Sequence, residues 1–113
     1  MSVSMVVLAS RPPTWTREQF TVWWRGEHAA FAKRLPALQA YRHGEVTYDY
    51  DHPEEPAWDG HAVLTFANRE LLDAALNSSI WADAVAHVGK MKGKRIVLFT
   101  DEVDLLHGAP SQP

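Results

Sequence analysis

The sequence of 113 residues contains no cysteine, which excludes disulfides, thiol nucleophiles and thiolate metal sites. It also lacks an excess of positive charge: the net charge is −3 with neutral histidines, which gives no basic surface for nucleic acid. No apolar run approaches the roughly 18 residues of a membrane helix, and the short apolar run at the N-terminus has no basic leader. We therefore expect a soluble, cytoplasmic protein that binds neither nucleic acid nor membranes.

The common catalytic motifs are missing as well. There is no glycine-rich phosphate loop, no GxSxG elbow and no HExxH, and none of the six histidines are spaced as i, i+2 or i, i+4 metal ligands. Hydrophobic residues make up 46% of the chain, including five tryptophans, which is enough to form a core without disulfide bonds. We expect a single domain over residues 1–107, no metal site, and a flexible tail at 108–113.

The order of apolar patterns along the chain predicts a ferredoxin-like fold. The order is β-α-β-β-α-β, which gives a four-stranded antiparallel sheet with helices on one face, an α+β architecture. The other face needs cover, and the simplest cover is a second copy packed sheet to sheet, in a homodimer. The expected strands are residues 3–9, 38–50, 58–67 and 96 to about 106, and the expected helices are residues 16–35, 69–76 and 80–88.

The first helix carries the most informative residues. Phe20, Trp24, His28, Phe31 and Leu35 share one helical face, so a titratable imidazole lies within an apolar stripe. Either His28 is an inert, hydrogen-bonded core histidine, or the two rings beside it wall a cavity in which it transfers protons. Glu27 precedes His28 in the sequence but lies about 100° away around the helix, so we expect the hydrogen-bond partner of His28 to come from the sheet.

The sheet offers three candidates for that partner. Tyr41 and His43 share one face of strand 38–50, and His61 lies on strand 58–67. If the odd-numbered faces of both strands point the same way, the three side chains form a cluster. The Tyr41 phenol could then donate a hydrogen bond to a developing oxyanion.

Several short motifs resemble those of a known family. The run WRGEH at 24–28, followed by LPAL at 35–38 and Tyr41, resembles the first-helix signature of the EthD family, which belongs to the dimeric α+β barrel superfamily. Other pieces agree, namely Asp59-Gly60, Phe66, Ser78 to Trp81, and Asp83.

This resemblance implies a homodimer that acts on a small hydrophobic, aromatic or lactone-like molecule without a metal or organic cofactor, with His28 as the catalytic candidate. One position departs from the pattern. Many relatives have an acidic residue where this chain has Val63, and His61 could replace that residue as an acid or base.

The leading hypothesis is a cofactor-independent lyase or isomerase: a dehydratase, cyclase, decarboxylase or lactone isomerase acting on an aromatic, polyketide-like or lactone metabolite. The alternatives are a cofactorless monooxygenase and a non-catalytic protein that binds a small molecule as an accessory to a pathway. The expected catalytic residues are His28, Tyr41 and His61, and the expected substrate-binding residues are Trp24, Phe31, His43 and Trp81.

Overall fold

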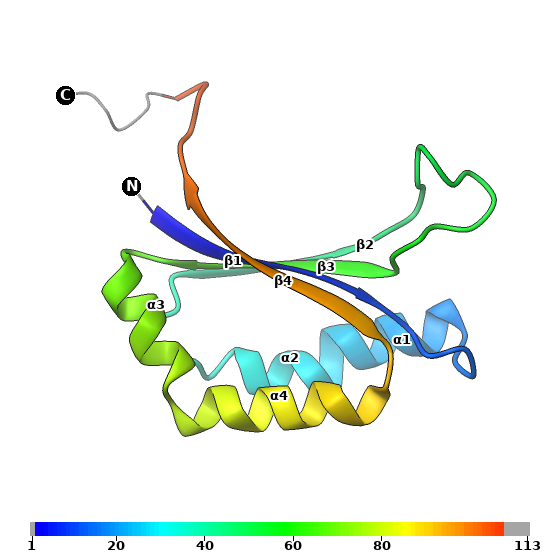
Figure 1. The fold of residues 1–113 in the computed structure, drawn as a ribbon, viewed down its shortest axis with the longest axis horizontal. Helices are drawn as coiled ribbons and strands as arrows, with labels where there is room; N and C mark the ends of the chain where they lie inside the picture. The colour runs from blue at the N-terminus through cyan, green and yellow to red at the C-terminus, as the bar shows by residue number, and fades with distance from the viewer. Residues whose placement is uncertain (1, 108–113) are drawn as a thin grey trace.

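The computed structural model describes residues 2–107, and the tail expected at 108–113 lies outside them. One antiparallel sheet lies above a layer of helices (Figure 1), in the strand order β2-β3-β1-β4. The strands are β1 (Ser2–Ser10), β2 (Ala40–Glu45), β3 (Gly60–Phe66) and β4 (Lys94–Glu102). The helices are α1 (Arg17–Trp23), the π-helical turn η1 (Trp24–His28), α2 (Ala29–Ala32), α3 (Arg69–Leu76) and α4 (Ser79–Met91). The predicted ferredoxin-like fold is confirmed.

Helix ends follow the capping signals in the sequence. Thr16 and Gln19 form the predicted capping box at the start of α1, and Asn68 caps α3 by accepting the backbone N–H of Leu71. The fourth helix begins one residue earlier than predicted, because Ser78 is its cap. It also continues to Met91, three residues beyond the predicted end at residue 88, and ends where Lys92 adopts a left-handed conformation.

The two middle strands of the chain, β2 and β3, are shorter than the apolar patterns predicted, whereas β1 is one residue longer at each end. Strand β2 stops at Glu45, which pairs with Gly60 at the start of β3, so the pattern beyond it belongs to a long loop, residues 46–59. The buried Asp59 fixes the end of this loop. Its carboxylate accepts the backbone N–H of Arg11 at 2.8 Å, and lies 2.5 Å from the Arg11 guanidinium and 3.5 Å from Nε of Arg17. The loop, the end of β1 and the start of α1 are thereby tied together.

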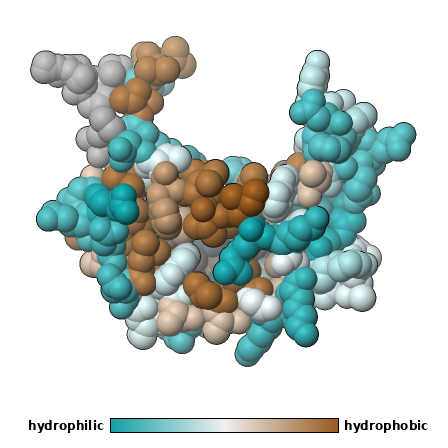
Figure 2. All heavy atoms as spheres, viewed as in Figure 1, coloured by the Kyte–Doolittle hydropathy of each residue, from teal (hydrophilic) through white to brown (hydrophobic). Residues whose placement is uncertain are grey.

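Alternate residues of the strands face the helices and build the core. The members of this core are apolar and buried. Its main members are Val3, Met5, Ala9, Phe20, Trp24, Leu35, Ala62, Leu64, Phe66 and Leu72. On the surface of the molecule, Figure 2 shows further hydrophobic atoms gathered near the middle of the side in view.

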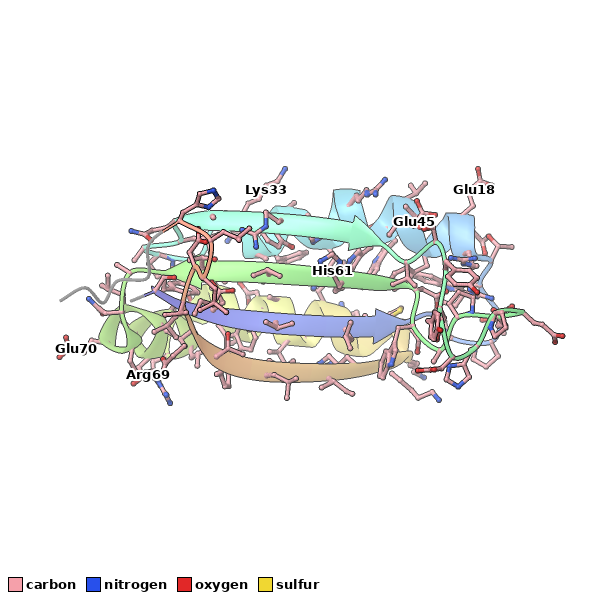
Figure 3. All side chains as sticks on the ribbon, turned by 90° about the horizontal axis from the view of Figure 1, so that it is seen from above. Glu18, Lys33, Glu45, His61, Arg69 and Glu70 are labelled. Atoms are coloured by element: carbon pink, nitrogen blue, oxygen red, sulfur yellow. The ribbon has the colours of Figure 1, made fainter. Side chains whose placement is uncertain are left out.

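The other side of the sheet has no helix over it, and we call it the open face. Figure 3 looks onto this face, with the helices behind the sheet and His61 labelled on β3. Its apolar members include Leu98, which is 52% exposed, and Ile96, which is 38% exposed. By strand register the open face comprises Ser2, Ser4, Val6, Leu8, Ser10, Ala40, Arg42, Gly44, His61, Val63, Thr65, Lys94, Ile96, Leu98, Thr100 and Glu102.

Within residues 2–107, none of the helices has both the length and the apolar character needed to cross a bilayer.

Candidate active site

A cavity lies between the helix-facing side of the sheet and the helices. Its enclosed volume is only about 50 Å³, and the roughly 480 Å³ of atom-free space around it includes open solvent at its mouth. Most of its wall is aliphatic, and only three side chains other than tryptophan bring polar groups to it: His28, Tyr41 and Arg95. An apolar cleft with a few converging polar groups is the usual form of a small-molecule site. The remaining lining residues are Met5, Val7, Trp24, Ala32, Ala62, Leu64, Trp81, Ala84, Val85, Val88 and Val97.

The π-helical turn places Trp24 and His28 on the cavity side. Trp24 is buried, and its ring centre lies 5.4 Å from that of Phe20, 5.4 Å from that of His28 and 5.0 Å from that of His43. All three rings lie within 23° of its plane. Single π-helical turns inside α-helices occur frequently at functional sites, and this one carries the WRGEH run.

His28 makes its hydrogen bond to another histidine. Its Nδ1 lies 3.0 Å from Nδ1 of His87 on α4, and Nε2 of His87 lies 3.2 Å from a carboxylate oxygen of Glu27. The expectation that the partner comes from the sheet is therefore wrong. The reason is that α2 and η1 pack beside α4, which brings His87 opposite His28, and Glu27 reaches His28 indirectly through His87.

Burial controls the charge of His28. Desolvation is the main cause that lowers its pKa from 6.5 to about 4, and the nearby positive charges of His87, His43 and Arg95 contribute to the same shift. At neutral pH the ring is therefore uncharged. A neutral imidazole can accept a proton or a hydrogen bond from a bound molecule.

Tyr41 and His43 lie together on the helix-facing side of β2. The Tyr41 hydroxyl is 2.7 Å from Nε2 of His43, and burial raises the pKa of Tyr41 to about 12, so the phenol stays protonated. Burial lowers the pKa of His43 to about 4, helped by the charges of Arg25, His61 and Lys33. If His43 donates to the phenol oxygen, the Tyr41 proton is free to point into the cavity. His43 itself lies behind Trp24 and does not line the cavity.

His61 lies on the opposite side of the sheet from Tyr41 and His43. Tyr41 pairs with Leu64 and His61 pairs with Gly44, so the odd-numbered residues of β2 and β3 point to opposite faces. The expected cluster of Tyr41, His43 and His61 is therefore not formed within one protomer. Val63 also lies on the open face. A carboxylate at that position would not line the cavity, so its absence does not change the cavity.

The other expected binding residues divide between the cavity and its surroundings. Trp81 lines the cavity, whereas Phe31 lies outside it and packs on His87, with ring centres 4.5 Å apart. Ala32, one residue further along the helix, takes the position in the wall expected for Phe31. Phe31 therefore supports His87, and the smaller side chain of Ala32 leaves space in the cavity.

Sequence reasoning missed His87 and Arg95. His87 lies between two apolar residues of α4, and its neighbour Val88, together with Ala84, faces the cavity. This position next to apolar residues was the feature of the sequence that could have pointed to His87. Arg95 precedes the expected start of the last strand at residue 96, but it pairs with Ala9 and lies on the helix-facing side of β4. Its position could be found only from the strand register.

Across residues 2–107, no three histidine or carboxylate side chains come close enough together to hold a metal ion.

The chain matches the EthD domain family over residues 12–92. It belongs to the EthD family. No curated protein sequence matches it significantly. Among solved structures it is similar to an EthD family protein from Bacillus halodurans, with a TM-score of 0.75, 15% identity, and coverage of 90% of this chain and 99% of that one.

Two further solved structures have the same fold. A dimeric ferredoxin-like protein of unknown function from Thermobifida fusca has a TM-score of 0.66 and 17% identity, covering 90% of this chain and 92% of that one. SnoaB, a cofactor-independent oxygenase from Streptomyces nogalater, has a TM-score of 0.68 and 12% identity, covering 95% of this chain and 98% of that one. At these identities the likeness establishes the fold.

Proposed function

We propose that this protein is a cofactor-independent lyase or isomerase in which His28 transfers a proton to and from a small aromatic, polyketide-like or lactone substrate. The observation that carries the proposal is the position of His28: it lines the apolar cavity while its Nδ1 is engaged by His87. Its Nε2 is therefore the ring atom available to a substrate. A base in a water-poor cavity beside a hydrogen-bond donor is suited to proton abstraction next to a carbonyl group.

The chemistry follows from the polar groups around the cavity. Nε2 of His28 takes a proton from a carbon next to a carbonyl, and the electron pair of the broken C–H bond moves to the carbonyl oxygen as an enolate. The Tyr41 hydroxyl and the Arg95 guanidinium, both in the cavity wall, can stabilise that negative charge. Return of the proton to another atom is an isomerisation, and loss of a neighbouring hydroxyl with a proton as water is a dehydration.

The low pKa of His28 is compatible with this role because the positive charge on its ring and the negative charge on the substrate form in the same step. An imidazolium is unfavourable in the empty cavity, where burial lowers the pKa to about 4. In the reaction the imidazolium forms next to an enolate, and opposite charges attract strongly where water is excluded. The flat walls supplied by Trp24 and Trp81 favour aromatic or conjugated substrates.

Hydrogen exchange at carbon tests this proposal without knowledge of the complete reaction. A panel of β-keto acids, phenolic ketones and unsaturated lactones in deuterated buffer should include compounds whose α-hydrogens exchange faster with the protein, as followed by NMR. His28→Gln should slow that exchange by about 10²–10⁴-fold. His52→Gln, on an exposed loop, is the matched control and should exchange at the wild-type rate. Equal rates for wild type and His28→Gln would exclude the role of His28.

A cofactorless monooxygenase is the second candidate, favoured by the similarity to SnoaB. The same base would deprotonate a phenol to a phenolate able to react with O₂. An oxygen electrode separates the two functions, since a lyase or isomerase consumes no oxygen. Tight binding of a panel compound with neither exchange nor oxygen uptake would support a non-catalytic binding protein.

We also propose that the protein is a homodimer paired through the open face. Leu98 and Ile96 are exposed there, and the similar protein from Thermobifida fusca is described as dimeric. Covering such apolar side chains with an identical surface removes them from water.

A further inference from the structure

We propose that His87 and Glu27 are positioning residues for His28, which fix its tautomer and carry its positive charge away from the cavity after proton transfer. The part that concerns proton transfer rests on the proposed function of His28. The part that concerns the tautomer stands on the hydrogen bonds alone and is tested separately.

The three side chains form one continuous chain of hydrogen bonds. Nδ1 of His28 meets Nδ1 of His87 at 3.0 Å, and Nε2 of His87 meets Glu27 at 3.2 Å. The two imidazole planes differ by only 5° and the ring centres lie 5.2 Å apart, which is compatible with a bond directed along the plane of both rings. Glu27 and His28 are adjacent in sequence but lie at opposite ends of this chain, because His87 from α4 stands between them.

The carboxylate determines where each proton lies. An ionised carboxylate only accepts hydrogen bonds, so Nε2 of His87 must carry a proton and donate to Glu27. When His87 is neutral, its Nδ1 is bare and accepts from His28, which then carries its proton on Nδ1. This leaves Nε2 of His28 as a lone pair facing the cavity, the state that a base needs.

The same chain can move the positive charge after the reaction. When Nε2 of His28 takes the substrate proton, the proton on its Nδ1 can pass to Nδ1 of His87, which leaves His28 neutral and His87 positively charged beside Glu27. The path runs outward: His28 is 8% exposed, whereas the side chains of His87 and Glu27 are 11% and 70% exposed.

Glu27 supplies a charge that the other groups near His28 do not. The guanidinium of Arg95 on β4 acts on His28 with a permanent positive charge, and the imidazoles of His87 on α4 and His43 on β2 act in the same direction when they are protonated. Glu27 on η1 is the carboxylate bonded to the chain, so it can balance an imidazolium that the other three would repel.

Aromatic rings hold the two histidines in place. Trp23 lies parallel to both, with ring centres 4.9 Å from His28 and 5.1 Å from His87, and Phe31 packs on His87. This explains why Phe31 lies outside the cavity. Rings locked in this way keep the hydrogen-bond geometry fixed.

The tautomer is tested by NMR, with no substrate required. Two-bond ¹H–¹⁵N spectra of the labelled protein at pH 7.5 should show His28 protonated on Nδ1, its signals being assigned by their loss in His28→Gln. In His87→Phe, which keeps a ring for stacking, the Nδ1 proton has no acceptor and His28 should shift to the Nε2-protonated form. A bare Nδ1 in the wild type, or an unchanged tautomer in His87→Phe, would overturn the proposal.

The rate of carbon exchange tests the charge-carrying role. His87→Phe should lower kcat by about 10–100-fold with little change in KM, as expected for loss of a group that orients another. Glu27→Gln, on an exposed position that should not disturb folding, should show a smaller loss, also in kcat. Asp104→Asn removes the carboxylate of a similar exposed pair with His107 and is the control without effect.

The outcomes separate the two proposals. An Nδ1-protonated His28 together with no effect of His28→Gln on exchange would leave the tautomer assignment standing and remove the proposed function. Normal kcat in both His87→Phe and Glu27→Gln, with a strong effect of His28→Gln, would keep the proposed function and remove the charge-carrying role of His87 and Glu27.

Discussion

The two faces of the sheet differ most in what surrounds a histidine. On the helix side, His28, His43 and His87 lie among tryptophan and phenylalanine rings, and burial lowers the pKa of the first two to about 4. On the open face, His61 lies over Gly44 with no helix above it. The same residue type becomes a candidate for catalysis only where packed rings exclude water.

The open face is organised differently. Its polar contacts are hydrogen bonds of Ser4 to Thr65 at 3.1 Å and to Glu102 at 2.8 Å, which link three neighbouring strands. Its apolar side chains, such as Leu98, remain exposed in a single protomer. The two proposals therefore place chemistry on one face and dimer assembly on the other.

The largest expected effect comes from a charge on the open face. Leu98→Glu should weaken dimer association by about 100-fold or more, because an unpaired charge buried at an interface costs several kcal/mol. Val22→Glu, which places the same charge on an exposed residue of α1, should leave association unchanged. Analytical ultracentrifugation measures both. A Leu98→Glu variant that dimerises as tightly as wild type would contradict the assignment of this face.

A second pair of variants applies one substitution to both faces. A Cβ at Gly60 would lie 2.9 Å from Nε1 of Trp24 and 3.0 Å from Phe20, both buried in the core. A Cβ at Gly44 would lie closer still to Cε1 of His61, but this ring is on the open face with no helix above it. We expect Gly60→Ala to lower the free energy of unfolding by about 1–3 kcal/mol and Gly44→Ala to lower it by less.

Urea denaturation at one protein concentration gives the two values. A Gly44→Ala loss equal to or larger than that of Gly60→Ala would show that His61 is fixed as firmly as the core rings. The double variant Gly44→Ala with His61→Ala should then recover the loss, since the group that the new methyl meets is removed.

The smallest expected effect is a change in pH dependence. The pKa values of His28 and His43 are near 4 in the folded protein against 6.5 for an ordinary histidine, so between these values the unfolded chain binds more protons. Their contribution to stability is fully present above pH 6.5 and is lost as the pH falls towards 4. In this window, the free energy of unfolding of His43→Gln should fall less steeply with decreasing pH than that of wild type. Val22→Ala changes no titrating group and should show the wild-type slope. Identical slopes for His43→Gln and wild type would contradict the shift at His43.

Much of the fold could be predicted because it depends on local signals. Thr16 with Gln19, and Asn68, mark helix starts through hydrogen bonds that span only three residues. Strand ends were less predictable, because the end of β2 depends on where its partner β3 begins, 15 residues later along the chain at Gly60. An apolar pattern gives the presence of a strand, and pairing gives its length.

The sequence by itself determined that His28 would lie in an apolar stripe beside Trp24, since helical periodicity places residues four apart on one face. The tertiary structure alone decided what His28 bonds to. His87 is 59 residues away and meets it because α4 packs against η1. Likewise, only the strand register separates His61 from Tyr41, because a shift of one residue in pairing moves a side chain to the other face of a sheet.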